Sequence, residues 1–149
     1  MMFITHISLG LLLGLIIVKS TALPVSQSLF IGAIILGSLF PDIDSATSFI
    51  GKRMKLVSLF FKHRGAIHSL PVMAACTMLF FIITGNAYYT MAFLLGYLSH
   101  LLIDSLTPMG VAWMWPSKKR IRGALRTTGI FDFLLLLFFT ALDLALIVA

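Results

Sequence analysis

Apolar residues fill five long segments of this chain, and polar or turn-forming residues separate the segments. The segments are residues 1–18, 26–40, 69–84, 88–106 and 129–148. All five prolines lie near segment ends or in the connections, where a proline disturbs a helix least. Several segments are shorter than the ~20 residues that usually cross a bilayer, a mismatch that small tilt or locally thinned lipid accommodates. The pattern predicts an all-α fold, a polytopic membrane bundle of about five transmembrane or membrane-embedded helices.

The composition agrees with a membrane protein of one domain. Hydrophobic residues make up 60% of the 149 residues and charged residues only 11%, which lies outside the range of soluble globular proteins. We therefore expect a single membrane-embedded domain over residues 1–149. The first segment lacks the basic start and the cleavage site of a signal peptide. Cys76 is the only cysteine, so the sequence offers no CxxC site and any metal must be bound by nitrogen and oxygen atoms.

The basic residues predict how the helices are oriented. Apart from Lys19, every Lys and Arg lies within residues 52–64 or 118–126. Five helices place these two connections on the same side of the membrane, and the positive-inside rule assigns that side to the cytoplasm. We expect a multi-pass protein of the cell (inner) membrane with a cytoplasmic N-terminus and an external C-terminus. The net charge of +6 is then a topology signal, and no nucleic-acid partner is expected. Residues 51–62 mix apolar and basic side chains and predict an amphipathic helix on the inner leaflet, in contact with membrane lipid.

Histidine and acidic residues gather at one predicted end of the helices. The chain has four histidines and five acidic residues, all of them aspartates. Only Asp143 lies elsewhere, further along the last segment. Because the topology was assigned from Lys and Arg alone, this convergence is an independent indication of a metal site at the cytoplasmic face. The eight converging residues are His6, Asp42, Asp44, His63, His68, His100, Asp104 and Asp132.

The strength of the metal interpretation differs between these residues. His100 and Asp104 are four residues apart, so one helix face presents both to a single ion; a structural hydrogen-bonded pair is the alternative. Asp42 and Asp44 follow Pro41, where a turn or a helix cap is the alternative. For Asp132, at the start of the last segment, the alternative is stabilisation of the helix dipole.

Several motifs, in the same order and at similar intervals, resemble the YdjM family of inner-membrane metal-dependent hydrolases, also called LexA-regulated hydrolases. They are an early histidine followed by PDID, SFIGKRMK, HRGAIHSL, GYLSHLLID and LTPMGVAWMWP, within about residues 5–116. The later acidic residue of the family, often a glutamate, is Asp132 here. The resemblance implies a hydrolase with a metal site built from these motifs.

That family is in turn distantly similar to the zinc-dependent phospholipase C and P1 nuclease superfamily, whose all-helical members hold zinc with His and Asp. The chain lacks a second His-x-x-x-acid element, because residue 128 is Thr. We therefore expect one or two zinc ions, with another divalent metal as the alternative. The resemblance implies metal ligands at His6, Asp42, Asp44, His68, His100, Asp104 and Asp132.

The implied activity is metal-assisted hydrolysis of a phosphoester in a lipid or another amphiphile at the inner leaflet. Asp42 or Asp44 would orient or deprotonate the attacking water, and His63 is a further catalytic candidate. Arg64 would bind the phosphate with two hydrogen bonds, although a topology charge explains it equally well. Two other functions remain open: an ion or small-solute transporter, since ionisable residues within membranes often mark ion pathways, and a metal-stabilised scaffold without turnover.

Overall fold

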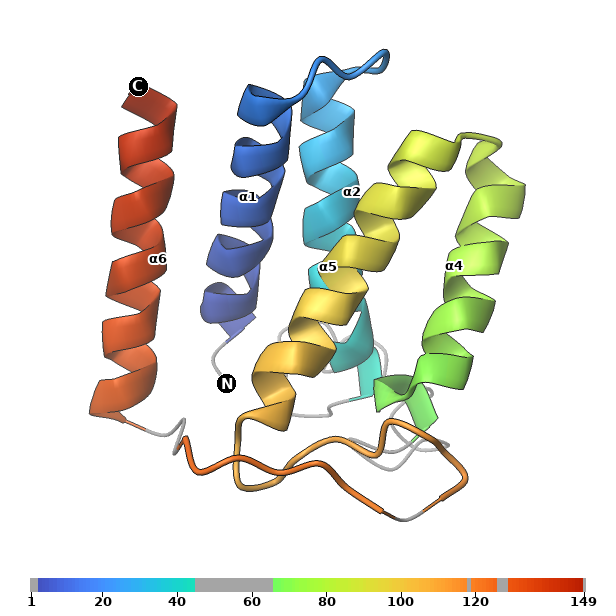
Figure 1. The fold of residues 1–149 in the computed structure, drawn as a ribbon, viewed down its shortest axis with the longest axis vertical. Coiled ribbons are helices and arrows are strands. Elements are labelled where there is room, and N and C mark those ends of the chain that lie inside the picture. The colour runs from blue at the N-terminus through green and yellow to red at the C-terminus, as the bar shows by residue number, and fades with distance from the viewer. Residues whose placement is uncertain (1–2, 45–65, 118, 126–128, 149) are drawn as a thin grey trace.

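Helices form along all five apolar segments in the computed structural model, which describes residues 3–44, 66–117, 119–125 and 129–148 (Figure 1). Each helix begins and ends within two residues of its predicted bounds, so the all-α prediction is confirmed. The described part contains no β-strand, only an isolated bridge between Val111 and Ile121. In chain order the elements are α1 (Phe3–Ser20), α2 (Gln27–Leu39), η1 (Phe40–Asp44), η2 (Ala66–His68), α4 (Leu70–Thr84), α5 (Ala87–Ser105) and α6 (Ile130–Val148), where η denotes a 3₁₀ helix.

The helices run alternately up and down, so one end of the bundle collects five helix ends. Figure 1 shows the start of α1, the end of α2, the start of α4, the end of α5 and the start of α6 together at the lower end. The N-terminal end lies there too, and the C-terminal end lies at the opposite end of the bundle. The polar ends of the helices therefore meet at one level, as the sequence pattern predicts.

A tight connection joins α4 to α5 and makes them antiparallel. Gly85 ends α4 with a left-handed φ of 59°, a conformation that glycine adopts without strain. Asn86 then caps α5, because its side-chain oxygen accepts hydrogen bonds from the backbone N–H groups of Tyr88 at 2.9 Å and Tyr89 at 3.2 Å. The local sequence thus fixes a sharp reversal at the end of the bundle remote from the histidines.

Two glycines let α2 and α5 approach each other closely. A Cβ atom on Gly37 would collide with the carbonyl oxygen of Phe93, and one on Gly96 would collide with that of Ile34. Small residues at such contacts are the usual basis of close helix packing in membranes. This contact sets the distance between the end of α2 and the last turns of α5, where the candidate ligands lie.

The predicted helices are confirmed, whereas the predicted membrane crossings and their orientation stay predictions. Within the described residues, α1 and α6 are long and apolar enough to cross a membrane, whereas α2 and α4 have 13 and 15 residues. Most of the apolar side chains of α6 are exposed, including Phe133, Leu137 and Phe138. The described residues thus form five α-helices, and five membrane crossings stay a prediction. The predicted amphipathic helix at 51–62 lies outside the described residues.

The connection from α5 to α6 folds back on itself beneath α5 (Figure 1). Val111 and Ile121 exchange two backbone hydrogen bonds of 3.0 Å, and the N–H of Leu125 donates to the carbonyl oxygen of Leu106 at 2.9 Å. Trp113 ties this connection to two helices. Its indole N–H donates to Ser105 Oγ at 2.7 Å, and its carbonyl oxygen accepts from the N–H of Leu70 at 2.9 Å. The connection thus holds the end of α5 and the start of α4 in a fixed relation.

Candidate metal centre

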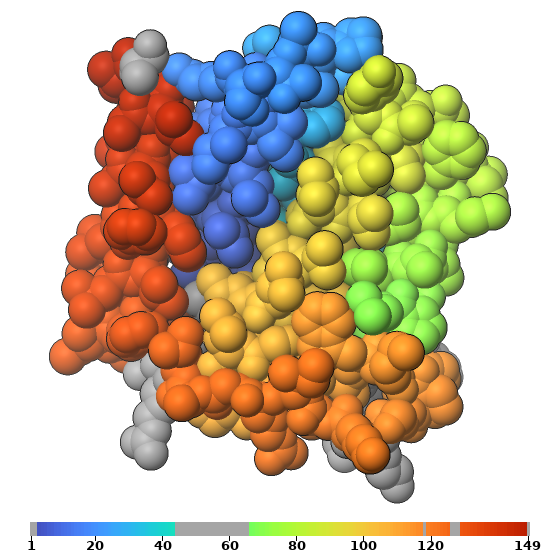
Figure 2. All heavy atoms as spheres, viewed as in Figure 1, coloured from blue at the N-terminus to red at the C-terminus, as the bar shows by residue number. Residues whose placement is uncertain are grey.

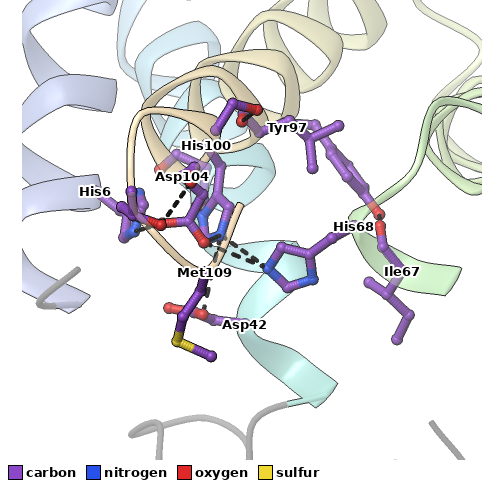
Figure 3. Close-up of polar contacts among 12 residues, drawn as sticks. His6, Asp42, Ile67, His68, Tyr97, His100, Asp104 and Met109 are labelled. Atoms are coloured by element: carbon purple, nitrogen blue, oxygen red, sulfur yellow. Dashed lines mark hydrogen bonds and ion pairs between the residues drawn. The ribbon is translucent and has the colours of Figure 1, made fainter. Parts of the chain in front are cut away.

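Five predicted side chains meet at the lower end of the bundle (Figure 3). They form two groups of three that share His100, and within each group the ligand atoms lie within 4.8 Å of one another. The first group is His6, His100 and Asp104, and the second is Asp42, His68 and His100. We refer to the five residues together as the His/Asp cluster.

The His/Asp cluster is almost completely removed from solvent. His68 and His100 are 0% exposed, His6 is 1% exposed and Asp104 is 2% exposed. The side chain of Asp42 is 14% exposed and is the most accessible of the five. Burying a carboxylate among imidazoles is costly without a compensating cation or good hydrogen bonds. A bound divalent cation would supply that compensation.

Asp104 lies at the centre of the cluster, with its two oxygens toward different partners. Oδ1 is 3.7 Å from His6 Nε2. Oδ2 is 3.7 Å from His100 Nε2 and 3.8 Å from His68 Nε2. All three distances exceed that of a good hydrogen bond. The carboxylate is therefore placed where it can bind an ion on the His6 side, on the His68 side, or on both.

The spacing of the nitrogens suits zinc. His68 Nε2 and His100 Nε2 lie 3.3 Å apart. Two nitrogens bound to one tetrahedral zinc at the usual bond length lie about 3.3 Å apart as well. Histidine nitrogens with carboxylate oxygens are also a donor set that zinc commonly takes in catalytic sites. The residues present therefore fit the metal that the sequence implies.

The backbone of α2 fixes the orientation of His100. His100 Nδ1 lies 2.7 Å from the carbonyl oxygen of Ser38. A carbonyl oxygen can only accept, so Nδ1 carries the proton and Nε2 keeps its lone pair in the neutral ring. Metal-bound histidines are typically oriented in this way. Sequence reasoning did not find Ser38, because a backbone oxygen leaves no signature in the residue type.

Tyr97 holds the segment that presents His68. Its hydroxyl donates to the carbonyl oxygen of Ile67 at 2.6 Å, and its side chain is fully buried. Ser69 closes the same turn by donating to the carbonyl oxygen of Ala66 at 2.5 Å. The sequence analysis did not identify Tyr97 as a site residue. Its position one helical turn before His100, on the same face of an apolar helix, could have indicated that it lies near the site.

His6 reaches the cluster from the first turn of α1. Its ring stacks on that of His100, with centroids 3.9 Å apart and an angle of 15° between the planes. The preceding residue, Thr5, donates from its hydroxyl to Asp132 Oδ1 at 3.0 Å. Asp132 is 1% exposed and lies outside both ligand groups. The structure thus places Asp132 between α1 and α6, and its predicted role as a ligand stays a prediction.

The other predicted site residues cannot be placed in the cluster. Asp44 ends η1, but its side chain lies outside the described part of the chain. His63 and Arg64 also lie outside the described residues. Their predicted catalytic roles therefore rest on the sequence alone.

Comparison with known proteins indicates the same family as the sequence motifs. The family model described as "YdjM inner membrane protein" matches residues 1–149. "Inner membrane protein YdjM" of Escherichia coli (strain K12) and the protein of the same name in Shigella flexneri are each 41% identical over 97 residues, 59% of this chain and 50% of each relative. "Uncharacterized protein YvsG" of Bacillus subtilis (strain 168) is 34% identical over 95 residues, 58% of this chain and 57% of that protein.

The extent of these matches differs between the comparisons. The chain spans about half the length of the curated relatives it matches. No solved structure matches the fold significantly. The family model, in contrast, covers the whole chain, and on that ground this chain belongs to the YdjM inner membrane protein family.

Proposed function

We propose that this protein is a membrane-bound, zinc-dependent hydrolase that cleaves a phosphoester in a lipid or another amphiphile at the inner leaflet. The observation that carries the proposal is the buried His/Asp cluster, in which His100 belongs to two groups of potential ligands. Membership of an inner membrane protein family supports the location. The distant resemblance of the motifs to zinc-dependent phospholipases supports the chemistry.

The cluster offers ligands for one ion or for two. His68, His100 and Asp104 would hold a first zinc, because their facing atoms lie within 3.8 Å of one another. His6 and the other oxygen of Asp104 would hold a second. Bound zinc would supply a Lewis acid for the phosphoryl oxygen and lower the pKa of a coordinated water to about 7.

Asp42 is the cluster residue best placed to act on water. Its side chain is more exposed than the other four, and Oδ1 lies 3.9 Å from His100 Nε2. A carboxylate at the edge of a metal site can hold the attacking water and accept its proton. Asp44 and His63 are the alternative bases, and Arg64 is proposed to bind the phosphate.

Transport is the second candidate function, and one observation favours it. Ser8 donates to Asp143 Oδ2 at 2.6 Å, and Asp143 is only 4% exposed. This polar pair lies between α1 and α6, deeper in the bundle than the cluster. Ionisable residues at membrane depth often mark ion pathways. A metal-stabilised scaffold without turnover is the third candidate, since five ligands are enough to saturate one zinc.

Metal analysis combined with a substrate screen tests the proposal. The protein is purified in detergent, its zinc content is measured, and the zinc-loaded protein is assayed against a panel of phospholipids and phosphodiesters. We expect one or two zinc ions per chain and release of a phosphorylated head group or of phosphate. If the zinc-loaded protein cleaves nothing in the panel but moves ions or solutes across liposome membranes, transport becomes the proposed function in place of hydrolysis. If the protein binds zinc but shows neither cleavage nor flux, the metal-stabilised scaffold becomes the proposed function.

A further inference from the structure

An apolar groove lies beside the His/Asp cluster, between α1, α5 and α6. Its volume is about 380 Å³, within the range of small-molecule sites. Figure 2 shows a furrow between α6 and the neighbouring helices on this face of the molecule. The residues that line it include Leu9 and Leu13 from α1, Ser99, Leu102 and Ile103 from α5, and Phe139 from α6.

The groove exists because α6 packs against α1 and leaves α5 uncovered. Polar contacts hold α6 to α1: Thr5 donates to Asp132 at 3.0 Å and Ser8 donates to Asp143 at 2.6 Å. Hydrogen bonds of this kind help to fix helix pairs in membranes. On the α5 side Leu102 is 50% exposed. The groove is therefore open toward the surroundings of the bundle at this residue.

Three residues that line the groove are close in sequence to candidate ligands. Ser99 and Ile103 directly precede the candidate ligands His100 and Asp104 on α5, and Leu9 lies three residues after His6 on α1. The hydroxyl of Ser99 donates to the carbonyl oxygen of Gly96 at 2.7 Å within its own helix. The walls are thus apolar, and they belong to the same turns of α1 and α5 that carry His6, His100 and Asp104, although none of these three side chains lines the groove itself.

Two other grooves on the bundle lack this continuity. One of about 380 Å³ includes Met73, Met78 and Leu94 in its lining. The other, of about 350 Å³, includes Leu29, Leu36 and Tyr89. No lining residue of either groove adjoins a member of the cluster in sequence. Lipid can fill any furrow on a membrane protein, but of these three grooves along the described residues, the one beside α6 is lined by the turns that carry candidate ligands.

Basic residues at the cluster end of the bundle favour a lipid with an anionic head group. Lys119 and Arg122 are exposed on the α5–α6 connection, which crosses the lower end of the bundle (Figure 1). An anionic head group would be attracted there while its chain lies against the apolar walls. We infer that the groove holds one acyl chain of an anionic phospholipid, with the phosphate turned toward the His/Asp cluster. This inference rests on the proposed function and names its substrate class.

Photolabelling tests the groove independently of turnover. The full chain is reconstituted in phosphatidylcholine vesicles that contain phosphatidic acid with a diazirine on one acyl chain, and labelled peptides are mapped after irradiation. We expect label on residues 99–106 and around Phe139. Leu102→Trp should fill the groove and lower this labelling about tenfold. Met78→Trp, placed in the other groove of about 380 Å³, should leave it unchanged.

A second measurement connects the groove to the reaction. Leu102→Trp should lower the rate on long-chain phosphatidic acid more than the rate on a short-chain analogue, with zinc content unchanged. If Leu102→Trp does not fold, Leu13→Phe narrows the same groove from α1 and serves instead. Label spread evenly over the bundle, or equal labelling of wild type and both tryptophan variants, would overturn the inference even if the protein cleaves phosphoesters. Label confined to the groove in a protein that cleaves no phosphoester would support the lipid site and remove the proposed activity.

Discussion

His100 donates its Nδ1–H to the carbonyl oxygen of Ser38, 2.7 Å away. Ser38 lies in the last turn of α2, where carbonyl groups begin to lose their partners within the helix. A helix-end oxygen thus becomes the group that orients a candidate ligand on another helix. The contact occurs next to Gly37 and one turn after Gly96, where a Cβ atom on either glycine would collide with the backbone of the other helix. Helix packing and the geometry of the metal centre are therefore coupled at this point.

Gly96→Ala should disturb the metal centre without touching a ligand. The new methyl group would collide with the carbonyl oxygen of Ile34 and push α5 away from α2. Overpacking of this kind typically costs about 1–3 kcal/mol of stability, and loss of an orienting partner weakens metal binding about 10–100-fold. Thermal unfolding in detergent and zinc titration measure the two effects.

Gly32→Ala is the matched control on α2. A Cβ at Gly32 meets no atom within 4 Å, and alanine is favoured over glycine inside a helix by about 1 kcal/mol. We expect equal or higher stability and unchanged zinc affinity. Unchanged zinc affinity in a folded Gly96→Ala protein would show that the glycine contact does not set the position of His100.

Removal of His100 or Asp104 should release metal. Both are buried, and each faces at least two other members of the cluster. His100→Ala and Asp104→Ala should therefore each lower the zinc content of purified protein, because each opens a site built from few ligands. Asp143→Asn, on α6 and hydrogen-bonded to Ser8, is the control and should keep its zinc. Full zinc in both the His100 and Asp104 variants would contradict the assigned centre.

Catalysis should be separable from metal binding at one position or more. Asp42, Asp44, His63 and Arg64 are to be substituted singly, with zinc content and phosphoester hydrolysis measured for each variant. At least one variant should keep nearly normal zinc and lose about 10²-fold or more in rate, as is typical for loss of a general acid–base group. If every variant that keeps zinc also keeps its rate, these residues do not supply the base or the phosphate contact.

The orientation of the bundle is tested by reporter fusions. A reporter placed within residues 107–126 should be cytoplasmic, because basic residues concentrate there and in residues 52–64. A reporter after Ala149 should be external. A cytoplasmic reporter at the C-terminal end would contradict the orientation and would also remove the argument for five crossings.

The helix bounds could be predicted because apolar runs and their interruptions are local properties. Gly85-Asn86 marks the reversal between α4 and α5, and Pro41 lies two residues after the end of α2, within η1. The convergence of His6, His68 and His100 could be predicted too, since the alternation of helix directions decides which ends meet. These inferences need no knowledge of which helices are neighbours.

Contacts between neighbouring helices could not be predicted from the sequence, because they depend on which helix faces meet. Thr5 as the partner of Asp132, and Ser8 as the partner of Asp143, follow from the packing of α6 on α1. The partner of Gly37 is the backbone of α5, nearly sixty residues away in sequence. The hydrophobic pattern does not encode such pairings, since the apolar helices present similar surfaces on several sides.

The order in which the chain contributes to the His/Asp cluster has a consequence for biogenesis. His6 leaves the ribosome first, and Asp104 comes near the end of α5, so the set of five is incomplete until that helix has been inserted. None of the five comes from α6. The set of five is therefore complete once α5 has been inserted, before α6 is needed. A ribosome-bound chain stalled after α5 would already present all five side chains, whereas one stalled after α4 would lack His100 and Asp104.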